Sequence, residues 1–267
     1  MDSGPIMTIF SFLFGLTLGS FLNVCIHRIP HKKSIIHPPS SCPQCGKRIR
    51  FYDNIPLISY IILRGKCRFC HQPIPIRYPV VELLTALLST ALFVRHGPSP
   101  QYFLFLSFCA SLVIISFIDL RHKIIPDIIS LPGILVGLAA ISIFKLNGIS
   151  WKDSLIGIIV GGGSLLLIGL IFEWLRGKEG LGMGDVKLLA MIGAWTGYLA
   201  LPYIVLISSL TGILIGGGSL LLTRRRFSEK IPYGPFLVLG TLVYLFFGTE
   251  LKHLWSNYLN LSNRVLS

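Results

Sequence analysis

Residues 102–118 have the sequence YFLFLSFCASLVIISFI, a run of 17 residues without a charged side chain. A transmembrane helix needs about 20 predominantly apolar residues, and no fewer than about 17, to cross the hydrocarbon core of a bilayer. Of the 267 residues in the whole chain, 52% are hydrophobic and 13% are charged, whereas soluble domains carry about 25% charged residues. With a mean hydropathy of +0.72, the chain is expected to be solvated largely by lipid.

Eight apolar segments of this kind predict an all-α polytopic membrane protein with about eight transmembrane helices. The sixth segment is short and interrupted by glycine, so we expect it to be partly re-entrant or to begin deep in the membrane. The first ends without a small-residue cleavage site and is interpreted as a retained helix. The predicted spans are residues 6–26, 79–95, 102–118, 128–146, 154–175, 186–199, 202–223 and 233–250.

The distribution of Lys and Arg predicts the orientation of these helices. Nineteen of the 24 Lys and Arg residues lie on one side of the predicted spans, in residues 27–78, 121–123, 176–187 and 224–230. The other five are Arg95, Lys145, Lys152, Lys252 and Arg264. The positive-inside rule places the richer side in the cytoplasm and both termini outside, as an even number of spans requires. The same distribution accounts for the net charge of +13, so no nucleic-acid partner is expected.

A polar stretch between the first two spans contains four of the six cysteines. Cys42-Pro-Gln-Cys45 and Cys67-Arg-Phe-Cys70 are separated by 21 residues. Each C-x2-C pair directs two thiolates at one point, and two pairs complete a closed, tetrahedral, structural zinc site. Because the segment has little apolar sequence, the metal would supply much of its folding energy. Two unrelated thiol pairs, or a redox pair, are the alternatives; disulfides are not expected in a reducing cytoplasm.

This stretch divides the predicted protein into three parts. They are a first transmembrane helix (1–26), a small cytoplasmic zinc domain (27–78) and a transmembrane bundle (79–267). Cys25 and Cys109 lie inside apolar runs and are expected to be inert packing residues.

Two aspartates stand out among only eleven acidic residues, because ionisable groups near membrane spans are costly and are functional by default. Asp119 directly follows the run 102–118, and Asp185 follows Gly182 and Gly184 in a Gly-Met-Gly-Asp sequence. The predicted topology puts both aspartates at the cytoplasmic ends of spans. Two carboxyls that share a site cannot both ionise cheaply, so one stays protonated while the other acts as a base and activates water. The glycines would let an extended substrate backbone approach closely.

Other ionisable residues have competing interpretations. Asp127 follows a proline and could be the N-cap of the fourth span, or it could support the aspartate site. Lys187 could hold a negative charge near the aspartates or anchor its helix by snorkelling. Glu82 could pair with a nearby Arg or Lys, and Asp53 is expected to stabilise a local turn. On spacing alone, Gly-x-Gly-Asp is a weak motif.

Taken together, the motifs resemble those of the prepilin peptidases, or type IV leader peptidases, over nearly the whole chain. Any one segment is modest evidence, but the combination in the family's order is specific. The matching segments are Gly19–Val24, Arg28–Pro30, Cys42–Cys45, Asp53–Tyr60, Arg64–Cys70, Arg77–Pro79 with Glu82, Asp119–Asp127, Gly182–Leu188 and Ile231–Phe236.

The resemblance implies a membrane aspartyl protease of the GxGD type in the bacterial cytoplasmic (inner) membrane, with its active site facing the cytoplasm. Such enzymes cut prepilins and pseudopilins after the glycine that ends a short basic leader. The family's two catalytic aspartates match Asp119 and Asp185. The bundle's lipid-open side is expected to admit the apolar helix start of the substrate.

The resemblance also implies a second activity. Family members with the cysteine domain usually N-methylate the new N-terminal residue from S-adenosyl-L-methionine, so the chain is expected to be bifunctional. Family methylation depends on the stretch that matches Arg64, Gly65 and Lys66 and on nearby acidic residues, of which Glu82 is a candidate. Two alternatives are a methyltransferase with structural aspartates, and a transporter whose aspartates form a proton relay near the bilayer midplane.

Overall fold

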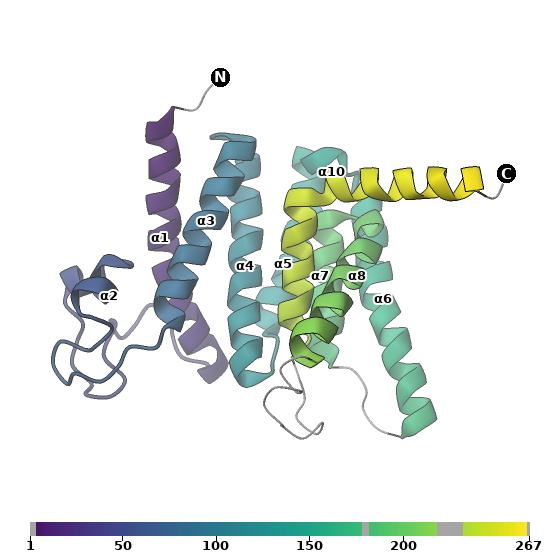
Figure 1. Cartoon of the computed structure of the whole chain (residues 1–267). Helices are drawn as coiled ribbons and strands as arrows, with labels where there is room; N and C mark the ends of the chain where they lie inside the picture. Colours follow the sequence, from purple (N-terminus) through teal and green to yellow (C-terminus); the bar gives the residue numbers. More distant parts are fainter. Residues whose placement is uncertain (1–3, 178–181, 218–231, 266–267) are drawn as a thin grey trace. The chain divides into compact units, whose positions relative to one another are not determined.

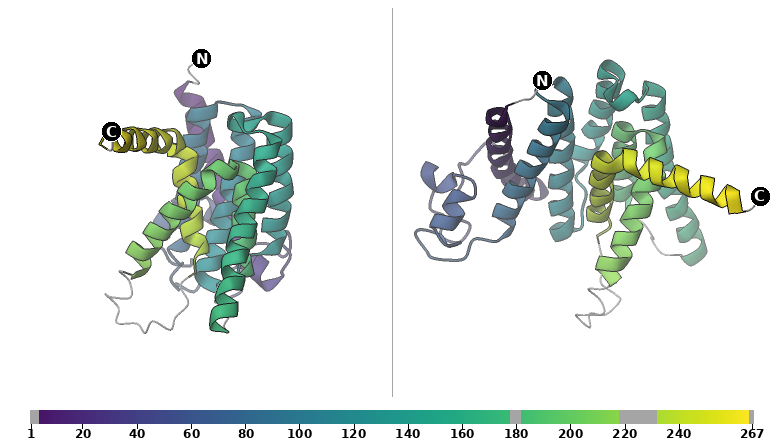
Figure 2. Two further views of the ribbon diagram at one scale, coloured as in Figure 1. Left: turned by 90° about the vertical axis from the view of Figure 1, so that its right-hand side faces the viewer. Right: turned by 45° about the horizontal axis from the view of Figure 1, so that its top comes forward.

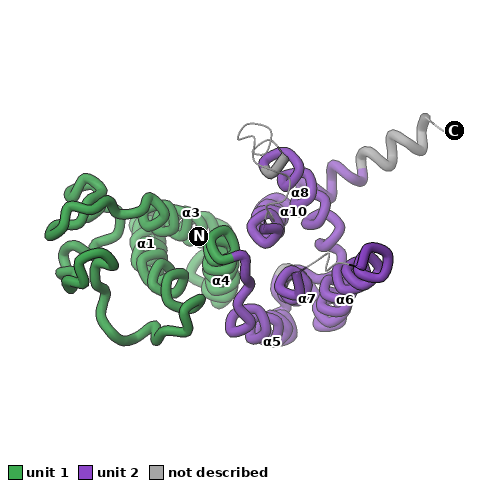
Figure 3. The backbone as a smooth tube through the Cα atoms, turned by 90° about the horizontal axis from the view of Figure 1, so that it is seen from below, with its two compact units in different colours: residues 1–122 green, residues 123–267 purple. Residues whose placement is uncertain are grey.

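The computed structural model covers the whole chain and describes residues 4–177, 182–217 and 232–265 (Figure 1). The chain divides into two compact units, residues 1–122 and 123–267 (Figure 3), and each is described by itself. The helices of the first unit are α1 (Pro5–Arg28), η1 (Ile29–His31), η2 (Phe51–Asn54), α2 (Ile58–Ile62), α3 (Arg77–His96) and α4 (Pro100–His122). Those described in the second are α5 (Asp127–Phe144), η3 (Leu146–Gly148), α6 (Trp151–Arg176), α7 (Met183–Thr196), η4 (Tyr198–Ala200), α8 (Leu201–Thr211), η5 (Gly212–Gly217) and α10 (Gly234–Val265).

The all-helical fold expected of a multi-pass membrane protein is confirmed. Within the described ranges, seven helices are long and apolar enough to cross a membrane. The sixth predicted segment corresponds to α7, which has only 14 residues. At 1.5 Å per residue such a helix is about 21 Å long, shorter than a hydrocarbon core of about 30 Å. The end of the seventh predicted span, 218–223, lies outside the described residues.

In the first unit, α1 and α3 pack closely along their length because small residues line the contact. A Cβ placed on Gly15 would lie 2.6 Å from Cα of Ala86, and one on Gly19 would lie 2.7 Å from Cα of Glu82. Small residues allow the same close backbone approach between membrane helices in general.

A buried hydrogen-bond network then joins these two helices to α4. The Ser89 hydroxyl donates to the carbonyl of Ser11 on α1 (2.8 Å) and bonds to the hydroxyl of Tyr102 on α4 (2.7 Å). These hydrogen bonds therefore link α1, α3 and α4 to one another.

Residues 32–76, called the cysteine module below, lie beside the ends of α1 and α3 (Figures 1 and 2). The module holds η2 and α2, and only Cys42 and Ser59 within it are buried. It therefore has almost no apolar core of its own, as the sequence predicted.

In the second unit, α7 packs against both α5 and α6. Its residues 188–196 are all buried. A Cβ on Gly193 of α7 would lie 2.1 Å from the carbonyl oxygen of Gly157 on α6, so the two backbones touch. The indole Nε1 of Trp195 donates to the carbonyl of Gly133 on α5 (2.9 Å). The sixth segment is thus apolar because the protein buries it, and its helix is shorter than a typical span.

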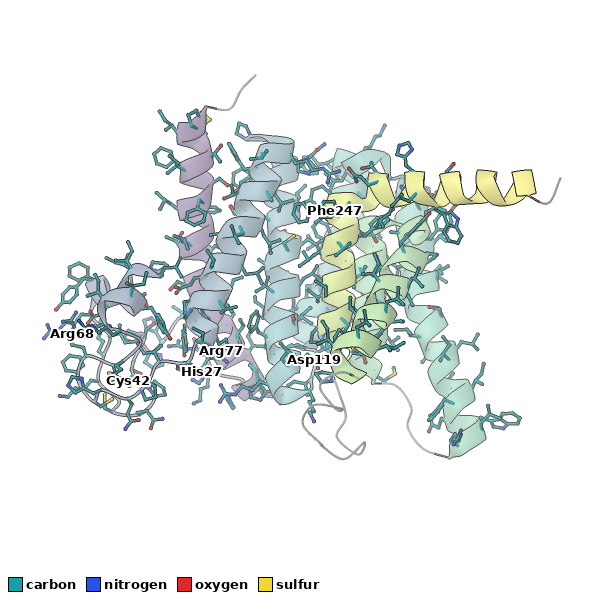
Figure 4. The ribbon with its side chains drawn as sticks, in the orientation of Figure 1. His27, Cys42, Arg68, Arg77, Asp119 and Phe247 are labelled. Atoms are coloured by element: carbon teal, nitrogen blue, oxygen red, sulfur yellow. The ribbon has the colours of Figure 1, made fainter. Side chains whose placement is uncertain are left out.

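The last helix changes direction within the described chain. Phe247 has non-helical backbone angles (φ −124°, ψ 17°), and α10 bends there (Figure 4). The predicted span 233–250 corresponds to the part up to the bend, and the helix continues to Val265, beyond the predicted end.

Candidate active site and metal centre

The four cysteines of the module form one cluster. The Sγ atoms of Cys42, Cys45, Cys67 and Cys70 all lie within 4.8 Å of one another. The Cys42 and Cys70 sulfurs are 3.8 Å apart, and a tetrahedral zinc with Zn–S bonds of about 2.3 Å places its sulfurs about 3.8 Å apart. The number of donors and their spacing therefore suit a closed four-thiolate metal site.

The backbone presents these thiols through two copies of one turn, residues 40–49 and 65–74. The two turns share their backbone hydrogen bonds and a left-handed residue after the second cysteine, Gly46 (φ 69°) and His71 (φ 56°). The repeat escaped the sequence interpretation because only the cysteines and the final isoleucine are common to both copies. The matching N–H to C=O bonds join Cys42 to Lys47 and Cys67 to Gln72, Gly46 to Cys42 and His71 to Cys67, and Ile49 to Ser40 and Ile74 to Gly65.

The second turn favours the thiolate form, which a metal requires, at Cys67, whereas the pKa of the neighbouring Cys70 thiol is raised to about 11. Backbone hydrogen bonds involving Cys70 and Phe69 are the main reason that the pKa of the Cys67 thiol is lowered to about 7. Cys25 and Cys109, expected to be packing residues, are both buried and lie outside the cluster.

An ion pair links the module's helical part to the second cysteine turn. The Arg68 guanidinium donates to both carboxylate oxygens of Asp53 at 2.6–3.1 Å. This bond holds the pKa of Asp53 below its usual value. The expectation that Asp53 stabilises only a local turn is wrong, because its partner lies 15 residues away.

A cavity of about 960 Å³ lies within the first unit, between the module and the ends of α1 and α3. Seven Arg and Lys side chains line it, together with two acids, Asp53 and Glu82. His27 lines the cavity from α1 and Arg77 lines it from α3. In Figure 4 both residues lie beside the part of the module that contains Cys42. Asp53 is held by Arg68, and Glu82 accepts a hydrogen bond from the backbone N–H of Leu57 (2.9 Å). The cavity is therefore strongly basic.

Two buried polar atoms in the lining have no hydrogen-bond partner: Oδ1 of Asn23 and Nε of Arg77. Asn23 is only 2% exposed, and its Nδ2 donates to the carbonyl of Tyr78 (3.0 Å). Nearly all buried polar groups are hydrogen-bonded in folded proteins. Both residues lie in segments that carried the family resemblance, but nothing in the sequence gave either one a role.

The methyl-transfer candidates fall into two groups. Glu82 lines the cavity and is 8% exposed, and its carboxylate accepts a hydrogen bond from the backbone N–H of Leu57, whereas an Arg or Lys partner was expected. The described lining does not include Arg64, Gly65 or Lys66, which form the entry to the second cysteine turn. Arg64 and Gly65 both have positive φ (50° and 67°), and a Cβ on Gly65 would lie 3.0 Å from the Tyr60 hydroxyl. The geometry gives these residues a role in shaping the turn.

The two predicted catalytic aspartates belong to different units. Asp119 lies in the last turn of α4 in the first unit and is 5% exposed (Figure 4). Asp185 lies in the first turn of α7 in the second unit and is half-buried, and its N–H donates to the carbonyl of Gly182 (3.0 Å). Their pairing stays a prediction from the sequence.

The surroundings of Asp185 require a glycine at only one of the two predicted supporting glycines. A Cβ on Gly184 would lie 2.9 Å from Cβ of Ile125, so this glycine lets the segment before α5 pack on the start of α7. At Gly182 an added Cβ would meet nothing closer than 3.6 Å, an ordinary contact with the Asp185 carboxylate.

An ion pair fastens the same segment to α7. Nζ of Lys187 lies 2.8 and 2.9 Å from the two carboxylate oxygens of Asp127. The expectation that Asp127 caps its helix is wrong: the N-cap is Pro126, and Asp127 is the first helical residue. The negative charge that Lys187 holds is that of Asp127.

Two family models match consecutive parts of the chain. Residues 13–96 match the family model described as Bacterial Peptidase A24 N-terminal domain, and residues 106–217 match the one described as Type IV leader peptidase family. Proteins named prepilin leader peptidase/N-methyltransferase are similar over most of the chain. The protein of Burkholderia pseudomallei (strain 1026b) is 38% identical over 267 residues, covering 90% of this chain and 85% of its own. That of Aeromonas hydrophila is 40% identical over 266 residues, covering 90% of each chain, and that of Pseudomonas aeruginosa is 38% identical, covering 92% of each. No solved structure was found to match.

Proposed function

Because the chain belongs to the type IV leader peptidase family, we propose that it is a prepilin leader peptidase and N-methyltransferase. The observation that carries the proposal is the similarity to relatives of that name over nine-tenths of the chain, which includes both the cysteine module and the aspartates. The enzyme would cut prepilins and pseudopilins after the leader glycine. It would then methylate the new N-terminal residue from S-adenosyl-L-methionine.

For the peptidase, we propose that Asp119 and Asp185 form the catalytic pair. The aligned peptide dipoles of a helix favour negative charge at its first turn and disfavour it at its last. Asp185 lies in the first turn of α7 and Asp119 in the last turn of α4. This supports Asp185 as the ionised base that activates water. Asp119 would be the protonated partner that polarises the scissile carbonyl and protonates the leaving amine.

For the module, we propose a structural zinc ion held by the four thiolates. A closed four-thiolate site leaves no coordination position for substrate, so the metal would stabilise the module and take no part in chemistry. S-adenosyl-L-methionine supplies an electrophilic methyl group when bound. The basic cavity beside the module is large enough for a ligand of that size, since ligand pockets usually measure about 300–1,000 Å³.

The protein would lie in the bacterial cytoplasmic membrane with its active site on the cytoplasmic side. The surplus of Lys and Arg on one side of the spans supports this orientation, and a short basic leader would be present there. The apolar start of a pilin helix would reach the enzyme through the lipid. No nucleic-acid partner is proposed.

The test is incubation of the purified full chain with a prepilin, with and without S-adenosyl-L-methionine, followed by mass measurement of the product. We expect loss of the leader in both cases and an added methyl group only with the methyl donor. Asp119→Asn and Asp185→Asn should each abolish cleavage while zinc content is kept. Asp153→Asn is the matched control, because Asp153 is a helix-capping residue of α6. Normal cleavage by either active-site variant would overturn the peptidase mechanism.

A further inference from the structure

Asn23 and Arg77 both line the cavity, and each has one buried side-chain atom without a hydrogen-bond partner. Only the NH₂ of an amide can donate, so the bond from Nδ2 of Asn23 to the Tyr78 carbonyl fixes the orientation of the amide. Oδ1 of Asn23 is therefore an acceptor without a donor, and Nε of Arg77 is a donor without an acceptor. Asn23 bonds to the backbone of the residue that directly follows Arg77, so it lies at the first turn of α3, the turn that contains Arg77.

A ligand that satisfies both atoms must carry both a donor and an acceptor. An α-amino acid group has this chemistry, because its ammonium donates and its carboxylate accepts on adjacent atoms. An arginine in a basic cavity favours a full carboxylate over a neutral carbonyl. Glu82 lines the same cavity and its carboxylate accepts a backbone N–H bond, so it can balance a positive charge on the rest of the ligand.

We propose that Asn23 and Arg77 bind the amino-acid end of the methyl donor in this cavity. Oδ1 of Asn23 accepts from the α-ammonium, and the Arg77 guanidinium donates through Nε to the α-carboxylate. The inference rests on the proposed methyltransferase function and assigns its donor site to the ends of α1 and α3. It replaces Arg64 and Lys66, whose side chains are exposed and lie outside the described lining.

The same chemistry could come from a second source, the new N-terminus of the cleaved substrate, which carries an ammonium and an amide carbonyl. Two probes separate the sources. S-adenosylhomocysteine has the amino-acid end of the methyl donor, and 5′-methylthioadenosine has the nucleoside without it. The unaltered chain should bind the first more tightly than the second, in the absence of any peptide.

The experiment measures the affinity of both probes for the full chain and for Asn23→Leu, Arg77→Met and the control Lys32→Met. Lys32 is exposed and outside the lining, so its variant removes one positive charge without touching the cavity. We expect each cavity variant to lose at least about tenfold in affinity for S-adenosylhomocysteine, the usual effect of losing a hydrogen bond to a charged group. Affinity for 5′-methylthioadenosine should change little, and this serves as the internal check that each variant is folded.

Preference for S-adenosylhomocysteine that persists in both cavity variants, or that disappears in Arg64→Met instead, would overturn the inference. A short peptide with a free N-terminus that competes for the site, while the two probes bind equally, would assign the pair to the substrate and also overturn it. The mass measurement above keeps this separate from the proposed function. If the unaltered chain methylates its product but the cavity variants still prefer S-adenosylhomocysteine, only the proposed donor site is wrong. If the unaltered chain never methylates its product, the proposed methyltransferase activity is wrong.

Discussion

We infer that the ion pair between Lys187 and Asp127 positions Asp185, the proposed catalytic base, without taking part in the chemistry. Lys187 follows Asp185 by two residues on α7, and Asp127 begins α5. Together with the packing of Gly184 on Ile125, their ion pair holds the segment before α5 against the turn that carries Asp185. The side chains are 30% and 55% exposed, so the pair should add less than about 1 kcal/mol to stability.

We therefore predict that Lys187→Met leaves the melting temperature nearly unchanged but lowers kcat for leader cleavage about tenfold, because small displacements of a catalytic group are costly. Lys187→Arg should retain most of the activity. The charge-reversed double variant, Lys187→Asp with Asp127→Lys, should recover part of what either single change loses. Steady-state kinetics with a prepilin substrate measures this, and a double variant no better than the single ones would exclude the positioning role.

At the same scale, some site residues could be predicted from sequence and others could not. The four cysteines were predictable because C-x2-C spacing dictates where the thiols point. Asp119 and Asp185 were singled out because acids beside membrane spans are rare. Asn23 and Arg77 were not, because the lack of a hydrogen-bond partner depends on how α1, α3 and the module pack. Motif spacing contains no information on that packing.

At the scale of elements, the contact between α6 and α7 depends on glycine. A Cβ on Gly193 would lie 2.1 Å from the carbonyl oxygen of Gly157, where neither backbone can yield without moving a helix. We predict that Gly193→Ala lowers the free energy of unfolding by about 1–3 kcal/mol, as overpacking does. Leader cleavage should fall as well, because α7 carries Asp185.

Gly163→Ala is the matched control for this change. Gly163 lies within α6, and an added Cβ would meet nothing within 4 Å. Replacing a helical glycine by alanine in open space should be neutral or stabilising by up to about 1 kcal/mol. The melting temperatures of Gly193→Ala and Gly163→Ala are compared in the same detergent. Equal melting temperatures would show that α6 and α7 do not pack as described.

Element types were more predictable than element roles. Apolar run length predicted eight segments that lie in helices, and seven of the described helices are long and apolar enough to cross a membrane. It could not separate a helix surface buried by protein from one that faces lipid, and so it did not show that α7 is short and largely buried against its neighbours. The continuation of α10 beyond residue 250 was not predicted, for the related reason that its later residues are not apolar enough to resemble a span.

At the scale of the whole molecule, the two units should depend on metal to different degrees. The cysteine module has only two buried residues, so apolar burial contributes little to its stability, and the proposed metal would supply much of its folding energy. The second unit is built from helix packing and contains no cysteine. Loss of metal should therefore unfold one part of the chain and leave the other folded.

We predict that a strong chelator, or Cys42→Ser or Cys67→Ser, makes residues 30–77 sensitive to protease while peptides from α5 to α7 stay protected. Methyl transfer should be lost before leader cleavage, because the cavity shares a wall with the module whereas Asp185 lies in the other unit. Cys25→Ser controls for loss of a thiol outside the cluster and should keep about one zinc per chain. Limited proteolysis with mass analysis measures the order of events. Simultaneous digestion of both units would mean that the metal holds more of the molecule together than the module, and zinc far below one per chain would remove the metal from the explanation.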